Sequence, residues 1–291
     1  MTATARATLI GGIAVLLWGA LALFTTLTGR VPPFQLVAMA FAVAFLLAAV
    51  KWAVRCDRPT LFLAQPMPVW LLGVGGLVGY HFFYFMALRN APPVDASLIA
   101  YLWPLLIVLF SALLPGERLR WWHLAGAVLG LAGTALLVTD GGRVAFRGEY
   151  ALGYAAAFAC ALTWSVYSVL SRRFGSVPTD TVGWFCLASA ALGAVCHLAF
   201  EATVWPQGAA EWLAVLALGL GPVGAAFFAW DHGVKRGDIR ALGAFAYAAP
   251  LISTLLLLAF GQARWGWTVG AACLAIVGGA VLASRDLLRR G

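Results

Sequence analysis

The sequence predicts an all-α integral membrane protein with ten transmembrane helices, arranged as two inverted five-helix repeats around a central cavity. Hydrophobic residues make up 63% of the 291 positions and charged residues only 10%, whereas soluble domains are about half apolar and about a quarter charged. Ten separate apolar runs are long enough to cross a bilayer, and features of the first half recur in the second. The lipid bilayer is therefore the first partner that the chain requires.

Each run approaches the roughly 20 apolar residues that a bilayer-crossing helix needs. The expected spans are Thr8–Thr28, Phe34–Val50, Met67–Leu88, Ala96–Leu114, Trp121–Thr139, Ala151–Leu170, Thr181–Phe200, Trp212–Trp230, Ala241–Gly261 and Trp265–Ala283. The first run resembles a signal peptide, since Arg6 precedes it and Ala20 to Ala22 mimic a cleavage site. We interpret it as a span because it is of full length and has a counterpart in the second half that cannot be cleaved.

The distribution of Lys and Arg predicts that both termini are cytoplasmic. With ten spans, 14 of the 19 basic residues fall on the side of the N-terminus and 5 on the opposite side. Basic residues concentrate in cytoplasmic connections of membrane proteins. A miscount by one span would remove this bias, so the bias also supports the number of spans.

The chain lacks the motifs that several other classes of protein function need. The net charge of +8 comes without any basic block of five or more residues, so no nucleic-acid partner is expected. The five cysteines form no CxxC or CxxxC pair and no GxxxxGK loop occurs, so we expect no metal, no cofactor and no disulfide framework. The histidines are scattered over different spans and depths, which disfavours a catalytic centre; they are His81, His123, His197 and His232.

A shift of 146 positions aligns the two halves. Trp18 then meets Trp164, and the YxxP segment Tyr101–Pro104 meets Tyr247–Pro250. Because each repeat holds an odd number of spans, the second repeat (141–291) enters the membrane inverted relative to the first (1–140). Inverted repeats are common in secondary transporters, which bind substrate near the bilayer midplane between the copies. The pattern therefore predicts a transporter.

One segment carries a family signature. Pro104–Leu137 has a proline in the fourth span, Gly-Glu-Arg-Leu at 116–119, and glycines at 126 and 133 in the fifth span. With these features the chain resembles EamA-type members of the drug/metabolite transporter superfamily, and its Trp- and Tyr-rich spans make it similar to bacterial aromatic amino-acid exporters. The resemblance implies export across a bacterial cytoplasmic (inner) membrane. The chain departs from strict symmetry at Glu117, which corresponds to Ala263 in the second repeat.

The fourth and ninth spans each carry a polar face. Residues at helical spacing share these faces: Ser97, Tyr101, Pro104, Val108 and Ser111 in one, and Gly243, Tyr247, Pro250 and Thr254 in the other. In lipid, such hydroxyl groups are expected to face protein or water. Pro104 and Pro250 should kink their helices and free a backbone carbonyl that a substrate ammonium group could contact. A kink that serves packing alone is the alternative.

The segment GYHFFYFMALRN, Gly79–Asn90, places polar side chains in an apolar run. His81 and Tyr84 share one face and are expected to line the cavity; an interhelical hydrogen bond is the alternative for His81. Because imidazole titrates near neutral pH, His81 is also the candidate for proton coupling.

Three tryptophans lie deep in their spans. Trp18 and Trp164 are expected as cavity walls, and Trp103 and Tyr167 are further candidates. Tryptophans near span ends are expected at the membrane interface; they are Trp52, Trp70, Trp121, Trp122, Trp212, Trp265 and Trp267.

Depth divides the site candidates into two clusters. With a cytoplasmic N-terminus, His81, Tyr84 and Tyr101 fall in the outer half of the membrane. The inner half contains Trp164, Tyr167 and Tyr247. We expect the clusters to act as outer and inner gates in alternating access.

The sequence favours a secondary transporter that exports small-molecule substrates, namely amino acids including aromatic ones and other small amphipathic solutes. Aromatic walls provide stacking faces and hold ammonium groups by cation–π contact. The same chemistry suits organic cations, so a multidrug exporter is the close alternative, and an intramembrane enzyme is the remote one. Pairs such as Gly126 and Gly130 permit close helix packing, and the expected state is a monomer or a weak dimer.

Overall fold

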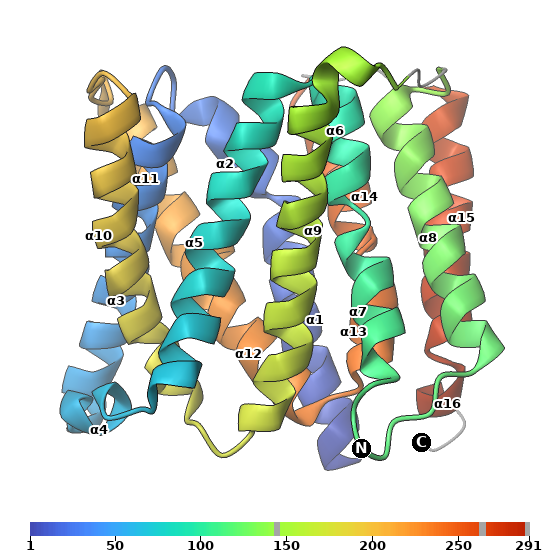
Figure 1. Cartoon of the computed structure of the whole chain (residues 1–291), viewed down its shortest axis with the longest axis horizontal. Helices are drawn as coiled ribbons and strands as arrows, with labels where there is room; N and C mark the ends of the chain where they lie inside the picture. The colour runs from blue at the N-terminus through green and yellow to red at the C-terminus, as the bar shows by residue number, and fades with distance from the viewer. Residues whose placement is uncertain (143–145, 262–265, 289–291) are drawn as a thin grey trace.

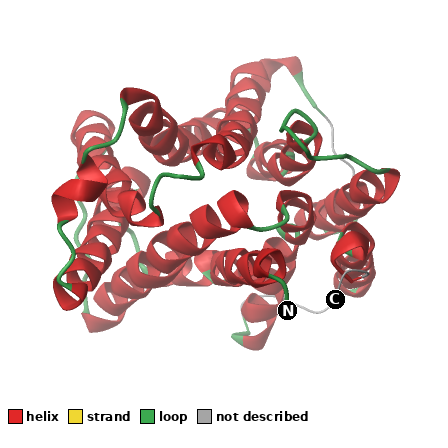
Figure 2. Ribbon diagram, turned by 90° about the horizontal axis from the view of Figure 1, so that it is seen from below, coloured by secondary structure: helices red, strands yellow, loops and turns green. Residues whose placement is uncertain are grey.

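The computed structural model describes residues 1–142, 146–261 and 266–288, and all regular structure in that part of the chain is helical (Figures 1 and 2). Nine of its helical segments are long and apolar enough to cross a membrane, and α15 (Trp267–Ala283) is a shorter apolar helix. The expected all-α membrane class is thereby confirmed. Some expectations concern residues outside the described ranges, namely Arg143, Ala263, Arg264, Trp265, Arg289 and Arg290.

Several spans are single helices. They are α3 (Pro33–Arg55), α5 (Met67–Asn90), α8 (Trp121–Thr139), α9 (Ala151–Ser171) and α10 (Val182–Phe200). Short 3-10 turns flank α9 and α10: η1 (Gly148–Tyr150), η2 (Arg172–Phe174) and η3 (Thr179–Thr181). Two short helices, α4 (Pro59–Leu63) and α16 (Arg285–Leu288), lie at the same end of the bundle as the start of α1 (Ala3–Gly19); we call this the lower end, as drawn in Figure 1.

Four spans are interrupted. The successive segments are α1 and α2 (Leu21–Leu27); α6 (Pro93–Ala100) and α7 (Trp103–Ser111); α11 (Ala209–Leu218), the π-helical η4 (Gly219–Ala225) and α12 (Ala226–Arg236); and α13 (Ile239–Phe245) and α14 (Ala248–Ala259). The break at Tyr101–Leu102 lies just before Pro104, and the break at Ala246–Tyr247 lies before Pro250. Proline supplies no N–H and clashes with the turn that precedes it, so the helix ends at that turn. The fourth and ninth spans are therefore divided near the prolines at which the sequence predicted a kink.

Helix starts use proline and acidic groups. Pro33 and Pro93 open α3 and α6, where the missing N–H is not needed. The buried carboxylate of Glu201 accepts from the N–H groups of Phe34 and Gln35 at 3.0 and 3.1 Å. A negative charge at this end of α3 is favourable because it meets the positive end of the helix dipole.

The two halves of the chain interleave. The most extensive contacts are between α8 and α15, α5 and α9, α3 and α10, and α1 and α12. Each of these pairs joins one helix from residues 1–140 to one from residues 141–291. Neither half therefore forms a bundle that packs independently of the other.

The contact between α8 and α15 is close enough to require glycine. A Cβ atom at Gly126 would lie 2.4 Å from the Gly279 carbonyl oxygen, whereas a Cβ at Gly270 on α15 would meet nothing within 4 Å. Gly126→Ala should therefore force the helices apart and cost about 1–3 kcal/mol of stability, and Gly270→Ala should not. Thermal unfolding of the two variants in detergent tests this, and equal midpoints would contradict it.

Candidate functional site

Four tryptophan rings meet at the centre of the bundle. We call Trp18, Trp103, Trp164 and Trp230, which come from α1, α7, α9 and α12, the tryptophan cluster. The Trp18 ring centroid lies 6.1 Å from that of Trp103, 5.6 Å from that of Trp164 and 5.0 Å from that of Trp230. Edge-to-face and tilted pairs at these separations are favourable because ring edges carry positive charge and ring faces negative charge.

Hydrogen bonds orient two of these rings. The Trp18 Nε1–H donates to the Pro222 carbonyl oxygen at 3.0 Å. Pro222 lies in η4, a π-helical segment of the kind often found at functional sites. The Trp230 Nε1–H donates to the Ser168 Oγ at 3.0 Å. The indole rings are thus anchored at their polar edges and leave their faces to neighbouring rings.

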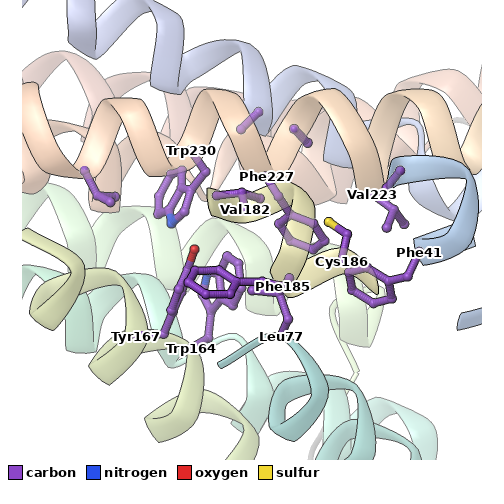
Figure 3. Packing of buried hydrophobic residues seen from close by; sticks show 14 of the residues in the cluster. Phe41, Leu77, Trp164, Tyr167, Val182, Phe185, Cys186, Val223, Phe227 and Trp230 are labelled. Atoms are coloured by element: carbon purple, nitrogen blue, oxygen red, sulfur yellow. The ribbon is translucent and has the colours of Figure 1, made fainter. Parts of the chain in front are cut away.

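The rings of the tryptophan cluster are largely enclosed by the surrounding helices. Trp103, Trp164 and Trp230 are buried, and Trp18 is half-buried. Phe227 completes the aromatic wall, with its ring 5.6 Å from that of Trp164 and stacked on Phe41 at 5.6 Å (Figure 3). Trp18, Trp103 and Trp164, which the sequence suggests as cavity walls, are thus brought together, and their role as cavity walls stays a prediction.

Trp230 and Phe227 were missed by sequence reasoning, although a signal for them exists. The offset of 146 that pairs Trp18 with Trp164 also pairs Trp230 with Tyr84 and Phe227 with His81. Trp230 is the last residue of the expected span Trp212–Trp230 and precedes the charged Asp231, so it was not among the candidates.

The polar face of α5 adjoins the cluster. The Tyr80 ring lies 5.5 Å from that of Trp164 and is stacked with that of Tyr84. His81 contacts Phe41, and its Nδ1 lies 2.7 Å from the Leu77 carbonyl oxygen. Because a carbonyl can only accept, this Nδ1 carries a proton and donates. Tyr84 approaches the Ser97 hydroxyl of α6, with 3.5 Å between the two oxygens.

The tyrosines differ in exposure between the two ends of the bundle. Tyr80, Tyr84 and Tyr101 lie toward the upper end, where α5 ends and α6 begins, and they are half-buried. Tyr167 and Tyr247 are buried. The Tyr247 hydroxyl accepts from the Leu105 N–H at 3.1 Å, at the start of α7.

The lower end is held by charged groups from both halves. We call Glu117, Arg172, Asp238 and Arg240 the lower network. Glu117 pairs with Arg172 at 2.8 Å and with Arg240 at 3.4 Å, and Arg240 pairs with Asp238 at 3.1 Å. Arg172 also donates to the Val234 and Gly237 carbonyls, at 3.1 and 2.7 Å, where α12 ends.

Asp238 is held in its charged form. Burial alone would raise the pKa of Asp238, but hydrogen bonds and charge from Arg240, with the N–H groups of Arg240 and Ala241, keep it below its usual range. Because the pKa is lower in the folded chain, the stabilisation is present at neutral pH and is lost as the pH falls through that lowered pKa.

The described residues also bear on the question of a metal site. No group of three or more His, Cys, Asp or Glu side chains that could hold a metal ion lies within the described residues. Around the tryptophan cluster, hydroxyl and imidazole groups offer a few polar anchors and the aromatic rings offer apolar faces. This combination suits a small organic solute with an aromatic part.

Three relatives of this chain are named as amino acid exporters. The chain is 58% identical over 279 residues, 96% of each protein, to a protein of Ancylobacter novellus named aromatic amino acid exporter YddG. It is 24% identical to the Escherichia coli protein of that name, over 95% of this chain and 96% of that protein. A probable terminal-alkyne amino-acid exporter of Streptantibioticus cattleyicolor is 28% identical, over 82% and 77% of the two chains.

Structure and family comparisons extend over the whole fold. One solved structure, 57% identical, superposes with a TM-score of 0.93 over 98% of each chain. The model of the EamA-like transporter family matches residues 6–139 and, a second time, residues 151–285. The chain therefore belongs to the EamA-like transporter family.

Proposed function

We propose that the protein exports amino acids, aromatic ones and other small amphipathic solutes included, across the cytoplasmic membrane by alternating access. The tryptophan cluster at the centre of a fold shared with a 58% identical aromatic amino acid exporter carries this proposal. The indole or phenyl side chain of an aromatic amino acid can stack on such rings, and the ammonium group of the same amino acid can be held by cation–π contact. His81, Tyr84 and Tyr101 would supply polar anchors.

The architecture in this proposal is ten membrane helices in two inverted repeats, residues 1–140 and 141–291, around a central cavity. The double family match supports it. So does the exchange in helix pairing: the first helix of one half packs on the third of the other, as α1 does on α12 and α9 does on α5. A twofold axis between the halves requires this exchange. With α15 as the tenth helix, the start of α1 and α16 share the lower end.

The lower end is the cytoplasmic end in this proposal. The excess of basic residues on the side of the N-terminus supports this orientation. The conformation is then closed toward the cytoplasm, because the lower network joins both halves while the tyrosines toward the upper end are half-buried. Export requires the lower end to open and the upper end, with Tyr80, Tyr84 and Tyr101, to close. One chain supplies the whole cluster, so a monomer suffices.

Transport by the purified protein in liposomes tests the function. Labelled tryptophan should move with saturable kinetics and be displaced by phenylalanine, with threonine as a weaker substrate. A pH step should change the rate if His81 couples transport to protons, and His81→Gln should remove that response. Movement of a quaternary ammonium compound without movement of tryptophan would contradict the proposal.

A further inference from the structure

A buried ion pair lies directly below the tryptophan cluster. On α12, the Lys235 Nζ is 2.9 Å from an Asp231 carboxylate oxygen, and the two side chains are only 4% and 2% exposed. The Thr179 hydroxyl donates to the other Asp231 oxygen at 2.7 Å, and Lys235 donates to the Val177 carbonyl at 3.1 Å. Charges placed inside a membrane protein are costly and usually serve function.

The pair does not connect the two halves of the chain. Of its partners, Val177 lies in the short connection between η2 and η3 and Thr179 is the first residue of η3, and both belong to the same half as α12. The lower network, by contrast, bridges the halves through Glu117. A purely structural role therefore explains little of why two charges are kept at this depth.

The upper end offers a contrasting buried carboxylate. Both oxygens of Glu201 are occupied by the N–H groups of Phe34 and Gln35, and His197 lies 3.0 Å away. Glu201 thus completes a helix end. Within the described residues, Asp231 accepts only from the side chains of Lys235 and Thr179, which can rotate away.

A buried hydroxyl stands beside the pair. Tyr167 is 2% exposed, and its hydroxyl makes no hydrogen bond of good geometry within the described residues. The Asp231 carboxylate and the Ser171 hydroxyl both lie close to it. Figure 3 shows this hydroxyl directed toward the Trp230 side of the cluster, and the Tyr167 ring lies 5.1 Å from that of Trp164.

From these contacts we infer that Asp231 and Lys235 form a subsite for the head group of a zwitterionic amino acid arriving from the cytoplasm. The ammonium group would pair with Asp231, and the carboxylate with Lys235 and the Tyr167 hydroxyl. The side chain would then lie against Trp164 and Trp230. This inference rests on the proposed function and specifies how its substrate is recognised.

Charge conservation makes the subsite selective. A zwitterion carries the same two charges as the pair, so an exchange of partners leaves no charge unpaired. A bare amine or a bare acid would strand either Lys235 or Asp231 in a medium of low dielectric. Sites that leave buried polar groups unpaired reject the incomplete ligand strongly.

Inside-out membrane vesicles, in which export becomes uptake, provide the test. Labelled tryptophan uptake is competed with tryptamine and indole-3-propionate, and an aliphatic set of leucine, isoamylamine and 4-methylpentanoate runs in parallel. The parent should prefer each zwitterion over its amine and its acid by at least tenfold, since one hydrogen bond to a charged group has about that effect.

Three variants and one control separate the roles. Lys235→Met should shift preference at least tenfold toward the amine, and Asp231→Asn should shift it toward the acid. The double change Asp231→Leu with Lys235→Met removes both charges, so it should fold and lose the discrimination. Lys51→Met is the matched control, because Lys51 pairs with Asp180 at the same end outside the subsite; it should keep the parent ranking.

Each outcome either supports or overturns the subsite or the proposed function. An unchanged zwitterion preference in the folded double variant would overturn the subsite, as would a double variant that unfolds while Lys51→Met folds. Charge-dependent shifts without any preference for aromatic over aliphatic ligands would support the subsite and refute the aromatic part of the proposed function. A parent that takes up none of these compounds would overturn both.

Discussion

Trp164→Ala is expected to reduce tryptophan export by roughly thirtyfold or more, the equivalent of about 2 kcal/mol of lost binding. Trp164 is the central ring of the site, since it contacts Trp18, Trp103 and Trp230 within the tryptophan cluster. It also contacts Tyr80 of α5. The substitution removes the ring on which a substrate could stack, and it leaves a space into which neighbouring rings can move.

The measurement is initial flux of labelled tryptophan in liposomes, normalised to folded protein. Trp18→Ala should show a similar loss, because its ring contacts the same partners from α1. Trp164→Phe should keep part of the rate. Trp121→Ala is the matched control, since Trp121 is 65% exposed at the start of α8. Flux retained in both Trp18→Ala and Trp164→Ala would refute the central site.

Glu117→Gln is expected to weaken closure of the lower end. The substitution keeps the size of the side chain but removes the charge that pairs with both Arg172 and Arg240. Loss of charge-assisted hydrogen bonds in this partly buried place costs about 1.5–3 kcal/mol. The conformation open toward the cytoplasm should therefore become at least tenfold more populated.

Thiol labelling reads this change directly. In a background without native cysteines, Ser168→Cys places a thiol beside the buried Trp230. A membrane-impermeant reagent added from the cytoplasmic side should label it at least tenfold faster in Glu117→Gln. Glu149→Gln, which breaks an exposed pair with Arg147, is the control and should leave the rate unchanged. Equal labelling rates in all three backgrounds would show that the lower network does not control access.

The apolar runs in the sequence were sufficient to predict the nine membrane-spanning segments found in the described residues, and the internal repeat was sufficient to single out Trp18 and Trp164. Trp18 and Trp164 were found because each lies deep in an apolar run and each is the repeat mate of the other. The interruptions before Pro104 and Pro250 were also foreseeable in place, since proline acts locally. The α1 break at Ala20 carries no proline, and it lies where Gly19 packs closely against Ile252 of α14. Such a break depends on a distant helix.

The features that the sequence did not reveal depend on contacts between helices that lie far apart in the chain. Trp52 was expected at the lipid interface, but it is 2% exposed, stacks on Trp184 and donates to Asp180. Its position near the end of a span was visible in the sequence, whereas the neighbouring helix α10 was not. The partners of Glu117 were hidden for the same reason, because Arg172 and Arg240 lie 55 and 123 positions further along the chain.

The crossed pairing of helices also sets the order of biogenesis. When α1 to α8 have been synthesised, the faces that α9, α10, α12 and α15 will cover still lack these partners. The four most extensive helix pairs can therefore form only as the later helices are synthesised, and the last of them forms when α15 arrives. Substitutions in such a protein should be compensated across the chain, for example on α9 for a change on α5, rather than by the next helix in sequence.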